Sequence, residues 1–508
     1  MARTRCSGVL LHPTSLPGPY GIGDLGPEAG RWLEWLAGAG CTVWQTLPLG
    51  PTGYGDSPYS CFSAFAGNPY LVSPDLLAAA GLLDLVDPAD VPRFPADRVD
   101  FGLVIPWKLG LLDRAFDRFR EGPAGPSAAR YRSFRRAHAG WLNDYALFMA
   151  LKEAHGGGTW AEWPDPLRHR RPQALRRARA SLALEVERQA FRQFLFFEQW
   201  GRLREHARSL GLRIMGDAPM YVAGDSADVW AHPDLFQLDA DLNPTVVSGV
   251  PPDYFTETGQ LWGNPLYDWE RHAADGYAWW IARLRSLLEL TDLVRIDHFR
   301  AFVDHWEVPA GSPTAQGGRW VWGPGTAFFQ EVEEALGRLP IVAEDLGELH
   351  PEVPALLKEL GLPGMKVLQF AYDGDPANPF LPRNHTADCV VYTGTHDNDT
   401  TVGWYRSLRP EQRRVVRAAL GSTGRGIARD LIRAAWASPA FLAVAPLQDV
   451  LEVGSEGRMN TPGSLGGNWA WRMGPGAATG AGQERLAAVN RESGRHRSAP
   501  TPPRSIPR

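Results

Sequence analysis

Residues 293–297, LVRID, form an apolar run that ends in an acid. Two further runs have the same pattern: PIVAED (340–345) and VVYTGTHDND (390–399). A strand buried on both faces, as in a parallel sheet, has this continuous apolar character. An acid at the carboxyl end of such a strand faces the side where parallel α/β barrels carry out their chemistry. The pattern predicts a parallel α/β fold with Asp297, Glu344 and Asp397 at one end.

Eight apolar runs can serve as barrel strands: SGVLLH (7–12), TVWQTLP (42–48), LRIMGD (212–217), LVRID (293–297), PIVAED (340–345), GMKVLQF (364–370), CVVYTGT (389–395) and FLAVAPLQ (441–448). Helical stretches lie between them, such as EAGRWLEWLAGAG (28–40), which has an apolar stripe at helical spacing. This alternation favours parallel βα units, and eight units predict a closed (β/α)8 TIM barrel. The alternative is an open doubly wound sheet, but HPTSLPGPYG after the first strand lacks the GxGxxG turn of that fold.

Two gaps between the expected strands are too long for ordinary loops. Residues 55–200 have helical patterning in their later part, and residues 218–291 are rich in Pro, Gly, Asp and aromatic residues. We expect both to be subdomains inserted at the catalytic face, where barrels vary. The expected units are strands one and two (1–54), a mainly helical insertion (55–200), the remaining barrel with the insertion 218–291 (201–475) and a tail (476–508). In the tail we expect a helix near 483–491 and then disorder.

The composition excludes several classes of protein. The 508 residues carry a net charge of −5, with no general basic field, so we expect no nucleic-acid partner. No segment approaches the roughly 18 apolar residues of a membrane span, and the apolar run near the amino terminus is too short for a signal peptide. The four cysteines form no CxxC pair and are expected to be reduced. We expect a cytoplasmic protein that does not bind membranes.

The acids of the predicted strands suit acid/base and nucleophilic chemistry. Arg295 and Asp297 are two residues apart on one strand, so both side chains face the same way. An arginine favours the ionised form of a neighbouring carboxylate, which a nucleophile requires. Glu344 would act as general acid, because an anion such as Asp297 raises its pKa. Such a pair is typical of glycoside cleavage, with Asp397 stabilising the positive transition state or holding sugar hydroxyls.

Two other interpretations of these acids remain. They could be strand-end caps or salt-bridge partners, although three of them at successive strand ends, flanked by His298 and His396, favour a site. The HDND cluster could also bind Ca²⁺, Mn²⁺ or Zn²⁺. The sequence has no HxH or HExxH, and Arg295 lies beside the acids. We therefore predict no metal and no cofactor.

Aromatic residues in loops indicate a carbohydrate ligand. The chain has 20 tryptophans and 13 tyrosines. Aromatic faces stack on apolar sugar faces, while neighbouring polar side chains bond the hydroxyls. The segment 248–265 holds Tyr254, Phe255 and Trp262 among Gly, Pro and polar residues, without core-facing periodicity. We predict that it is a lid loop.

The chain resembles the 4-α-glucanotransferases (amylomaltases, or disproportionating enzymes) of the α-amylase superfamily. The motifs that carry the resemblance span about residues 7–473: LLHPTSLPGPYGIGDLG, TGYGDSPYSCFSAFAGNPYL, GDAPMYVAGDSADVW, GVPPDYFTETGQLWGNPLY, VRIDHFR, AEDLG, GLPGMKVLQF, YTGTHDNDT, RMNTPG and GNWAWR. The resemblance implies that Asp297 is the nucleophile, Glu344 the acid/base and Asp397 the transition-state stabiliser. It also implies substrate contacts from Ser57, Tyr59, Asp217, Arg295 and His396. The superfamily's carboxy-terminal β-domain has no counterpart in this sequence.

The expected activity is retaining transfer of α-1,4-glucan segments. The donor would be a maltooligosaccharide, amylose, starch or glycogen, and the acceptor the 4-hydroxyl of a glucan or glucose. We expect a monomer. An α-glucan hydrolase would differ only in whether water or a sugar takes the second step. A catalytically silent glucan-binding scaffold is disfavoured by the three acids beside Arg295, and activity unaffected by EDTA would exclude a metal-dependent hydrolase.

Overall fold

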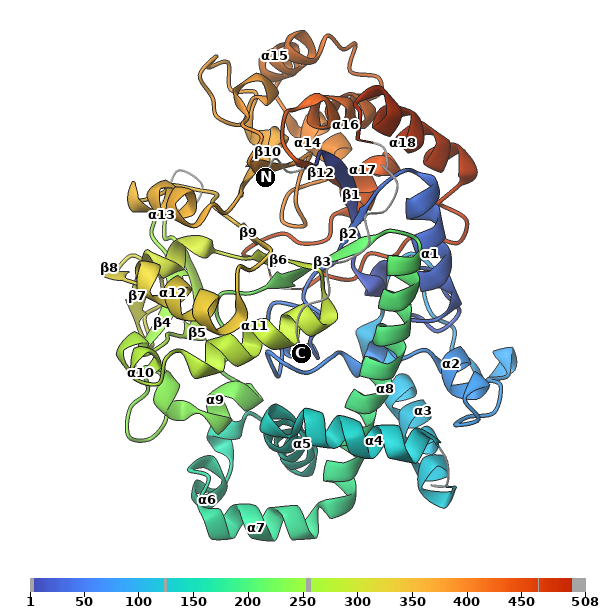
Figure 1. Cartoon of the computed structure of the whole chain (residues 1–508), viewed down its shortest axis with the longest axis vertical. Coiled ribbons are helices and arrows are strands. Elements are labelled where there is room, and N and C mark those ends of the chain that lie inside the picture. Colours follow the sequence, from blue (N-terminus) through green and yellow to red (C-terminus); the bar gives the residue numbers. More distant parts are fainter. Residues whose placement is uncertain (1–3, 123–125, 253–256, 465, 496–508) are drawn as a thin grey trace.

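A parallel sheet of eight strands forms a barrel at the centre of the computed structural model, which describes residues 4–122, 126–252, 257–464 and 466–495 (Figure 1). Its strands are β1 (Cys6–Leu10), β2 (Val43–Gln45), β3 (Arg213–Ala218), β6 (Leu293–Ile296), β9 (Ile341–Ala343), β10 (Gly364–Val367), β11 (Cys389–Tyr392) and β12 (Leu442–Pro446). Their order is β10-β11-β12-β1-β2-β3-β6-β9. The amide of Ala343 donates to the carbonyl of Pro363 over 2.9 Å, which joins β9 to the residue before β10. Each of the eight predicted runs overlaps one of these strands, and the predicted TIM barrel is confirmed.

The strands are apolar throughout because both of their faces are buried. In β11, Val390 and Tyr392 pack with the barrel interior, whereas Val391 packs with the surrounding helix layer. All four residues of this strand are buried. Continuous burial explains why the sequence pattern located these strands without a period of two.

Helices occupy most of the chain between β2 and β3. They are α2 (Pro74–Ala79), α3 (Phe101–Glu121), α4 (Pro126–Ala137), α5 (Ala139–Ala154), α6 (Asp165–Arg168), α7 (Pro172–Ser181) and α8 (Ala183–Ser209). Helix α1 (Pro27–Gly38) lies before β2. Figure 1 shows α4 to α7 grouped beside the barrel, with the long helix α8 running from this group to the strands. On α8, Trp200 donates from Nε1 to the carbonyl of Leu290 over 2.9 Å and packs against Trp44 of β2. The helical group is thereby anchored to the barrel.

A second sheet of four antiparallel strands lies beside the barrel strands β6 and β9 (Figure 1). It consists of β4 (Val246–Val250), β5 (Gln260–Pro265), β7 (Asp304–Pro309) and β8 (Arg319–Trp322), in the order β5-β4-β7-β8. The structure thus differs from the predicted loop at 248–265, because most of its described residues belong to β4 and β5. Pairing with β7, far along the chain, supplies the hydrogen bonds that hold β4 as a strand. Tyr254 and Phe255 lie outside the described residues.

The remaining α-helices are α9 (Ala227–Ala231), α10 (Trp269–Ala274), α11 (Ala278–Leu290), α12 (Gly325–Leu336), α13 (Glu352–Leu360), α14 (Thr401–Ser407), α15 (Pro410–Leu420), α16 (Ile427–Ala437), α17 (Leu447–Val450) and α18 (Gly480–Glu492). Helix α18 packs on α1 and α16, and its buried Asn490 accepts a hydrogen bond from Trp436 over 2.7 Å. This helix matches the one predicted in the tail, whereas the disorder predicted after it falls on residues 496–508, outside the described residues. In the described ranges, no helix is both long and apolar enough to cross a membrane.

Candidate active site

A buried guanidinium links two carboxylates at the carboxyl ends of β3 and β6. Asp217 and Arg295 are directly paired in the register of these strands. Arg295 donates from Nη1 to Asp217 Oδ2 over 2.7 Å and from Nη2 to Asp297 Oδ1 over 2.6 Å. Side-chain exposure rises along the row, from 0% for Asp217 and 4% for Arg295 to 29% for Asp297. The predicted contact between Arg295 and Asp297 is present, and Asp297 is the carboxylate of the row that substrate can reach.

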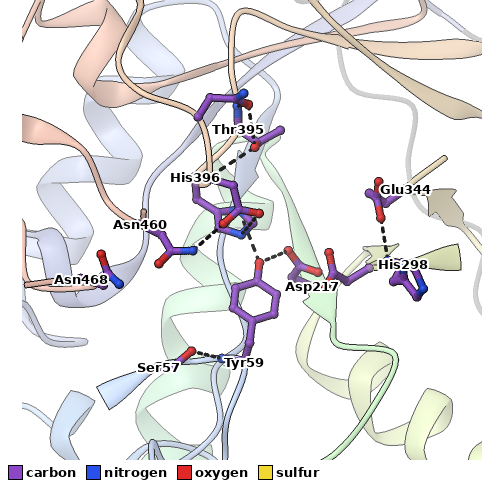
Figure 2. A network of polar contacts seen from close by, with 12 residues as sticks. Ser57, Tyr59, Asp217, His298, Glu344, Thr395, His396, Asn460 and Asn468 are labelled. Atoms are coloured by element: carbon purple, nitrogen blue, oxygen red, sulfur yellow. Dashed lines mark hydrogen bonds and ion pairs between the residues drawn. The ribbon is translucent and has the colours of Figure 1, made fainter. Parts of the chain in front are cut away.

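Glu344 follows β9 and is held by two backbone amides. Its Oε2 accepts from the amide of His298 over 2.7 Å, and its Oε1 accepts from the amide of Leu346 over 2.9 Å (Figure 2). His298 has left-handed backbone angles (φ 50°, ψ 47°), which are uncommon for a non-glycine residue. This turn directly after Asp297 aims the His298 amide at Glu344, so one short segment positions both carboxyl groups.

The surroundings of Glu344 suit a proton donor. Burial and, second, the negative charge of Asp297 raise its pKa to about 7, although Arg295 and the two amides act in the opposite direction. Glu344 therefore keeps its proton to a much higher pH than an ordinary glutamate does. The predicted effect of Asp297 is present, but burial contributes more.

Asp397 lies beyond the end of β11, and its orientation depends on residues about 60 positions later in the chain. Asn460 donates from Nδ2 to Asp397 Oδ1 over 2.6 Å, and Arg458 donates to the Asp397 carbonyl over 2.7 Å. His396 Nε2 lies 3.4 Å from Asp397 Oδ2. The Asp397 side chain is 43% exposed, so it is fixed at one oxygen while part of it remains open to a ligand.

Tyr59 and His396 form one wall of the site (Figure 2). Their rings stack with centroids 4.9 Å apart and planes 15° apart. The Tyr59 hydroxyl donates to Asp217 Oδ2 over 2.7 Å, which ties this wall to the buried charge row. The Tyr59 amide donates to Ser57 Oγ over 3.2 Å, which fixes the Ser57 hydroxyl close to Tyr59.

Trp262 covers another part of the site from β5. Its ring meets that of His298 edge to face, with centroids 4.8 Å apart. Burial lowers the pKa of His298 to about 4, so this ring is neutral at physiological pH. Trp262 remains 39% exposed and presents an apolar surface beside the turn that carries Asp297. Tyr254 and Phe255, predicted to act with Trp262, lie outside the described residues.

The structure therefore gathers the predicted residues around one site, apart from Tyr254 and Phe255, but their catalytic and binding roles stay predictions. The side chains of Asp217 and Arg295 are almost fully enclosed, so sugar contacts from them would require the site to open. Four residues that orient Asp397 were not predicted: Arg458, Asn460, and the turn formers Thr395 and Asn398. The motif RMNTPG contains Asn460, but a contact across such a sequence distance leaves no local signal. Within the described ranges, no three His, Cys, Asp or Glu side chains form a group that could hold a metal.

Comparison with known proteins gives one consistent result. A family model described as 4-alpha-glucanotransferase matches residues 11–477. The chain is 54% identical to the 4-alpha-glucanotransferase of Thermus thermophilus over 96% of this chain and 99% of that protein. It is 51% identical to that of Synechocystis sp. over 94% of this chain and 95% of that protein. Among solved structures, amylomaltase from Streptococcus agalactiae in complex with acarbose matches with a TM-score of 0.94 and 36% identity, covering 97% of this chain and 100% of that chain.

Proposed function

Because this chain belongs to the 4-alpha-glucanotransferase family and transfers α-1,4-glucan segments, we propose that its transfer proceeds by double displacement through a covalent glucosyl-enzyme on Asp297. The observation that carries this proposal is the pairing of two differently held carboxyl groups. Asp297 bonds a buried arginine, whereas Glu344 sits between two amides with a pKa of about 7. Carboxyl groups with environments that differ in this way suit a nucleophile and an acid/base.

In the first step, Asp297 attacks the anomeric carbon of the donor glucan. The bond from that carbon to the glycosidic oxygen breaks, and Glu344 gives its proton to this oxygen, so the shortened chain leaves as an alcohol. Arg295 holds the attacking carboxylate through the 2.6 Å hydrogen bond. The retaining reaction requires the carboxyl groups of Asp297 and Glu344 to lie roughly 5–5.5 Å apart.

In the second step, the 4-hydroxyl of an acceptor glucan or glucose attacks the same carbon. Glu344, now ionised, takes the hydroxyl proton, and the bond to Asp297 breaks. Two inversions at one carbon retain the α configuration. The amides of His298 and Leu346 support the ionised form of Glu344 between the two steps, because they donate to both of its oxygens.

Positive charge develops on the sugar ring in both transition states, and Asp397 stabilises it. Asn460 fixes Asp397 Oδ1, while His396 on the stacked Tyr59 wall lies next to Oδ2. An anion that is oriented before the reaction stabilises such charge without reorganising during the reaction. Ser57, Tyr59 and His396 supply further groups for sugar hydroxyls.

The segment 248–265 acts as a lid that favours an acceptor sugar over water. Water is present at about 55 M, so a sugar wins only where the site binds it and keeps water out. Trp262 offers an apolar surface beside His298. The enzyme works as a monomer, since one chain supplies every residue of this mechanism.

The enzyme works in the cytoplasm. Its four free cysteines suit that reducing compartment.

The direct test is to incubate the purified protein with maltotriose and to resolve the products. We expect glucose together with a ladder of longer oligosaccharides. Glucose and maltose alone would indicate hydrolysis and contradict transfer. Activity that is lost with EDTA and restored by a metal would contradict a mechanism carried only by the side chains named above.

A further inference from the structure

Exposed tryptophans are concentrated on one part of the molecule. Among the described residues, the three most exposed tryptophans are Trp262, Trp320 and Trp322. All three lie on the edge strands of the four-stranded sheet, which Figure 1 places beside the barrel strands β6 and β9. Trp262 belongs to the candidate active site. Trp320 and Trp322, on β8, have no part in the chemistry described above.

Trp320 and Trp322 face the same side of β8, because they are two residues apart on a strand. Their attachment points are therefore separated by about 6.6 Å, so one run of sugar rings can lie over both. Trp320 is 40% exposed and Trp322 is 58% exposed. We call these two side chains the tryptophan platform.

The tryptophan platform contacts the two loops that hold the carboxyl groups of the active site. Trp322 packs edge to face on His350, six residues after Glu344, with ring centroids 5.1 Å apart. The Arg300 guanidinium lies 3.6 Å from the centre of the Trp320 ring. Arg300 follows His298 by two residues and donates to the carbonyl of Glu348. A glucan that extends from the barrel mouth along these loops reaches the platform without crossing the molecule.

The chemistry around the platform also suits a polysaccharide. The Arg300 guanidinium over the Trp320 ring also pairs with Asp304, the register partner of Trp322, so charged groups border the aromatic surface. Indole faces flanked by hydroxyl-bonding groups are a common recognition surface for sugars. A stable protein interface needs about 20–30 residues on each side, far more than two tryptophans among charged neighbours.

We propose that the tryptophan platform is a second glucan-binding site, which holds a part of a long α-1,4-glucan that is remote from the bond being cleaved. This proposal rests on the proposed function and adds a preference for long chains. A short donor such as maltotriose cannot fill the active site and the platform together. Long amylose can fill both, and the second attachment raises its effective concentration at the site.

The test compares long amylose with maltotriose in the double variant Trp320→Ser/Trp322→Ser. We expect KM for amylose to rise about tenfold, while kcat and KM for maltotriose change less than about twofold. Trp322→Ser alone should give part of the effect and leaves the Arg300 stack intact. Trp320→Phe/Trp322→Phe should keep most of the affinity, since an aromatic face remains. Leu85→Ser, which alters an exposed residue outside the sheet, is the matched control and should change neither substrate.

Binding of amylose to Asp297→Asn, with and without the platform substitutions, separates this proposal from the mechanism. If the unaltered enzyme converts neither glucan, the proposed function fails, yet loss of amylose binding in the variants would still support the platform. Unchanged amylose affinity in the double variant would overturn the platform. Equal losses for both substrates, or a dimer of the unaltered enzyme that Trp322→Ser dissociates, would overturn it as well.

Discussion

The barrel mouth and the four-stranded sheet border the same site, but they are built in opposite ways. At the mouth, Asp297 follows the buried strand β6, and Glu344 follows β9, the parallel strand paired with it. In the sheet, antiparallel strands expose tryptophans on both edges. The difference indicates a division of work. In the proposed function, the mouth carries the catalytic acids, whereas the sheet carries the segment that favours an acceptor sugar over water.

The largest effect is expected at the mouth. Asp297→Asn removes the group that forms the covalent intermediate, so turnover on maltotriose should fall at least about a thousandfold. The fold and glucan binding should persist, because Arg295 retains Asp217 as a partner. Substantial activity in the pure variant, with deamidation back to aspartate excluded by mass spectrometry, would remove Asp297 from this role.

A smaller but clear loss of activity is expected from substituting Asn460, which orients Asp397. Asn460→Ala deletes the 2.6 Å hydrogen bond to Asp397, and kcat should fall about ten- to a hundredfold. KM should change much less, because the group acts on the transition state. Asn468→Ala is the matched control: Asn468 bonds the Thr461 amide rather than Asp397, so its loss should change kcat little. Equal effects of the two substitutions would indicate general disruption of this segment.

The pH dependence of activity tests the raised pKa of Glu344. Its pKa of about 7 in the free enzyme means that the required proton is present below this value and is lost above it. The logarithm of kcat/KM for maltotriose should therefore fall with a slope of −1 above about pH 7. A maltosyl fluoride donor needs no proton on its leaving group, so the same limb should be absent from its glycosylation step. If the rate still falls above about pH 7 with the fluoride donor, the titrating group is not Glu344.

The smallest effects are expected on the side of the sheet, and they concern the products. Tyr254→Ser or Phe255→Ser should shift maltotriose conversion towards hydrolysis severalfold, with donor cleavage reduced less than transfer. Leu261→Ser is a suitable control, because Leu261 projects from β5 opposite to Trp262. Glucose release and transfer products should be measured in parallel. If the segment only packs on the barrel, both activities will fall together and their ratio will stay constant.

The same contrast explains what the sequence could predict. The barrel strands were located because two buried faces leave an unbroken apolar run, as in β11. The acids were located because each follows such a run. The antiparallel sheet was missed because its edge strands β5 and β8 are largely exposed and lack the unbroken apolar run of a buried strand. Their strand conformation depends on partners far along the chain.

Contacts between distant segments were also beyond prediction from the sequence. The hydrogen bond from Asn460 to Asp397 joins residues 63 positions apart, and the motif around Asn460 carries no sign of it. The amides of His298 and Leu346 escape prediction for another reason. A backbone group is present at every residue, so only the left-handed turn at His298 shows that this amide is aimed at Glu344.

The covalent glucosyl-enzyme can be tested most directly by trapping it. In Glu344→Gln, maltosyl fluoride should still react with the nucleophile, because fluoride leaves without a proton, whereas the second step lacks its base. Mass spectrometry of the digested protein should then find a maltosyl group on the peptide that contains Asp297, and the added substitution Asp297→Asn should abolish the label. A label on another residue, or none while the fluoride is still consumed, would contradict the account.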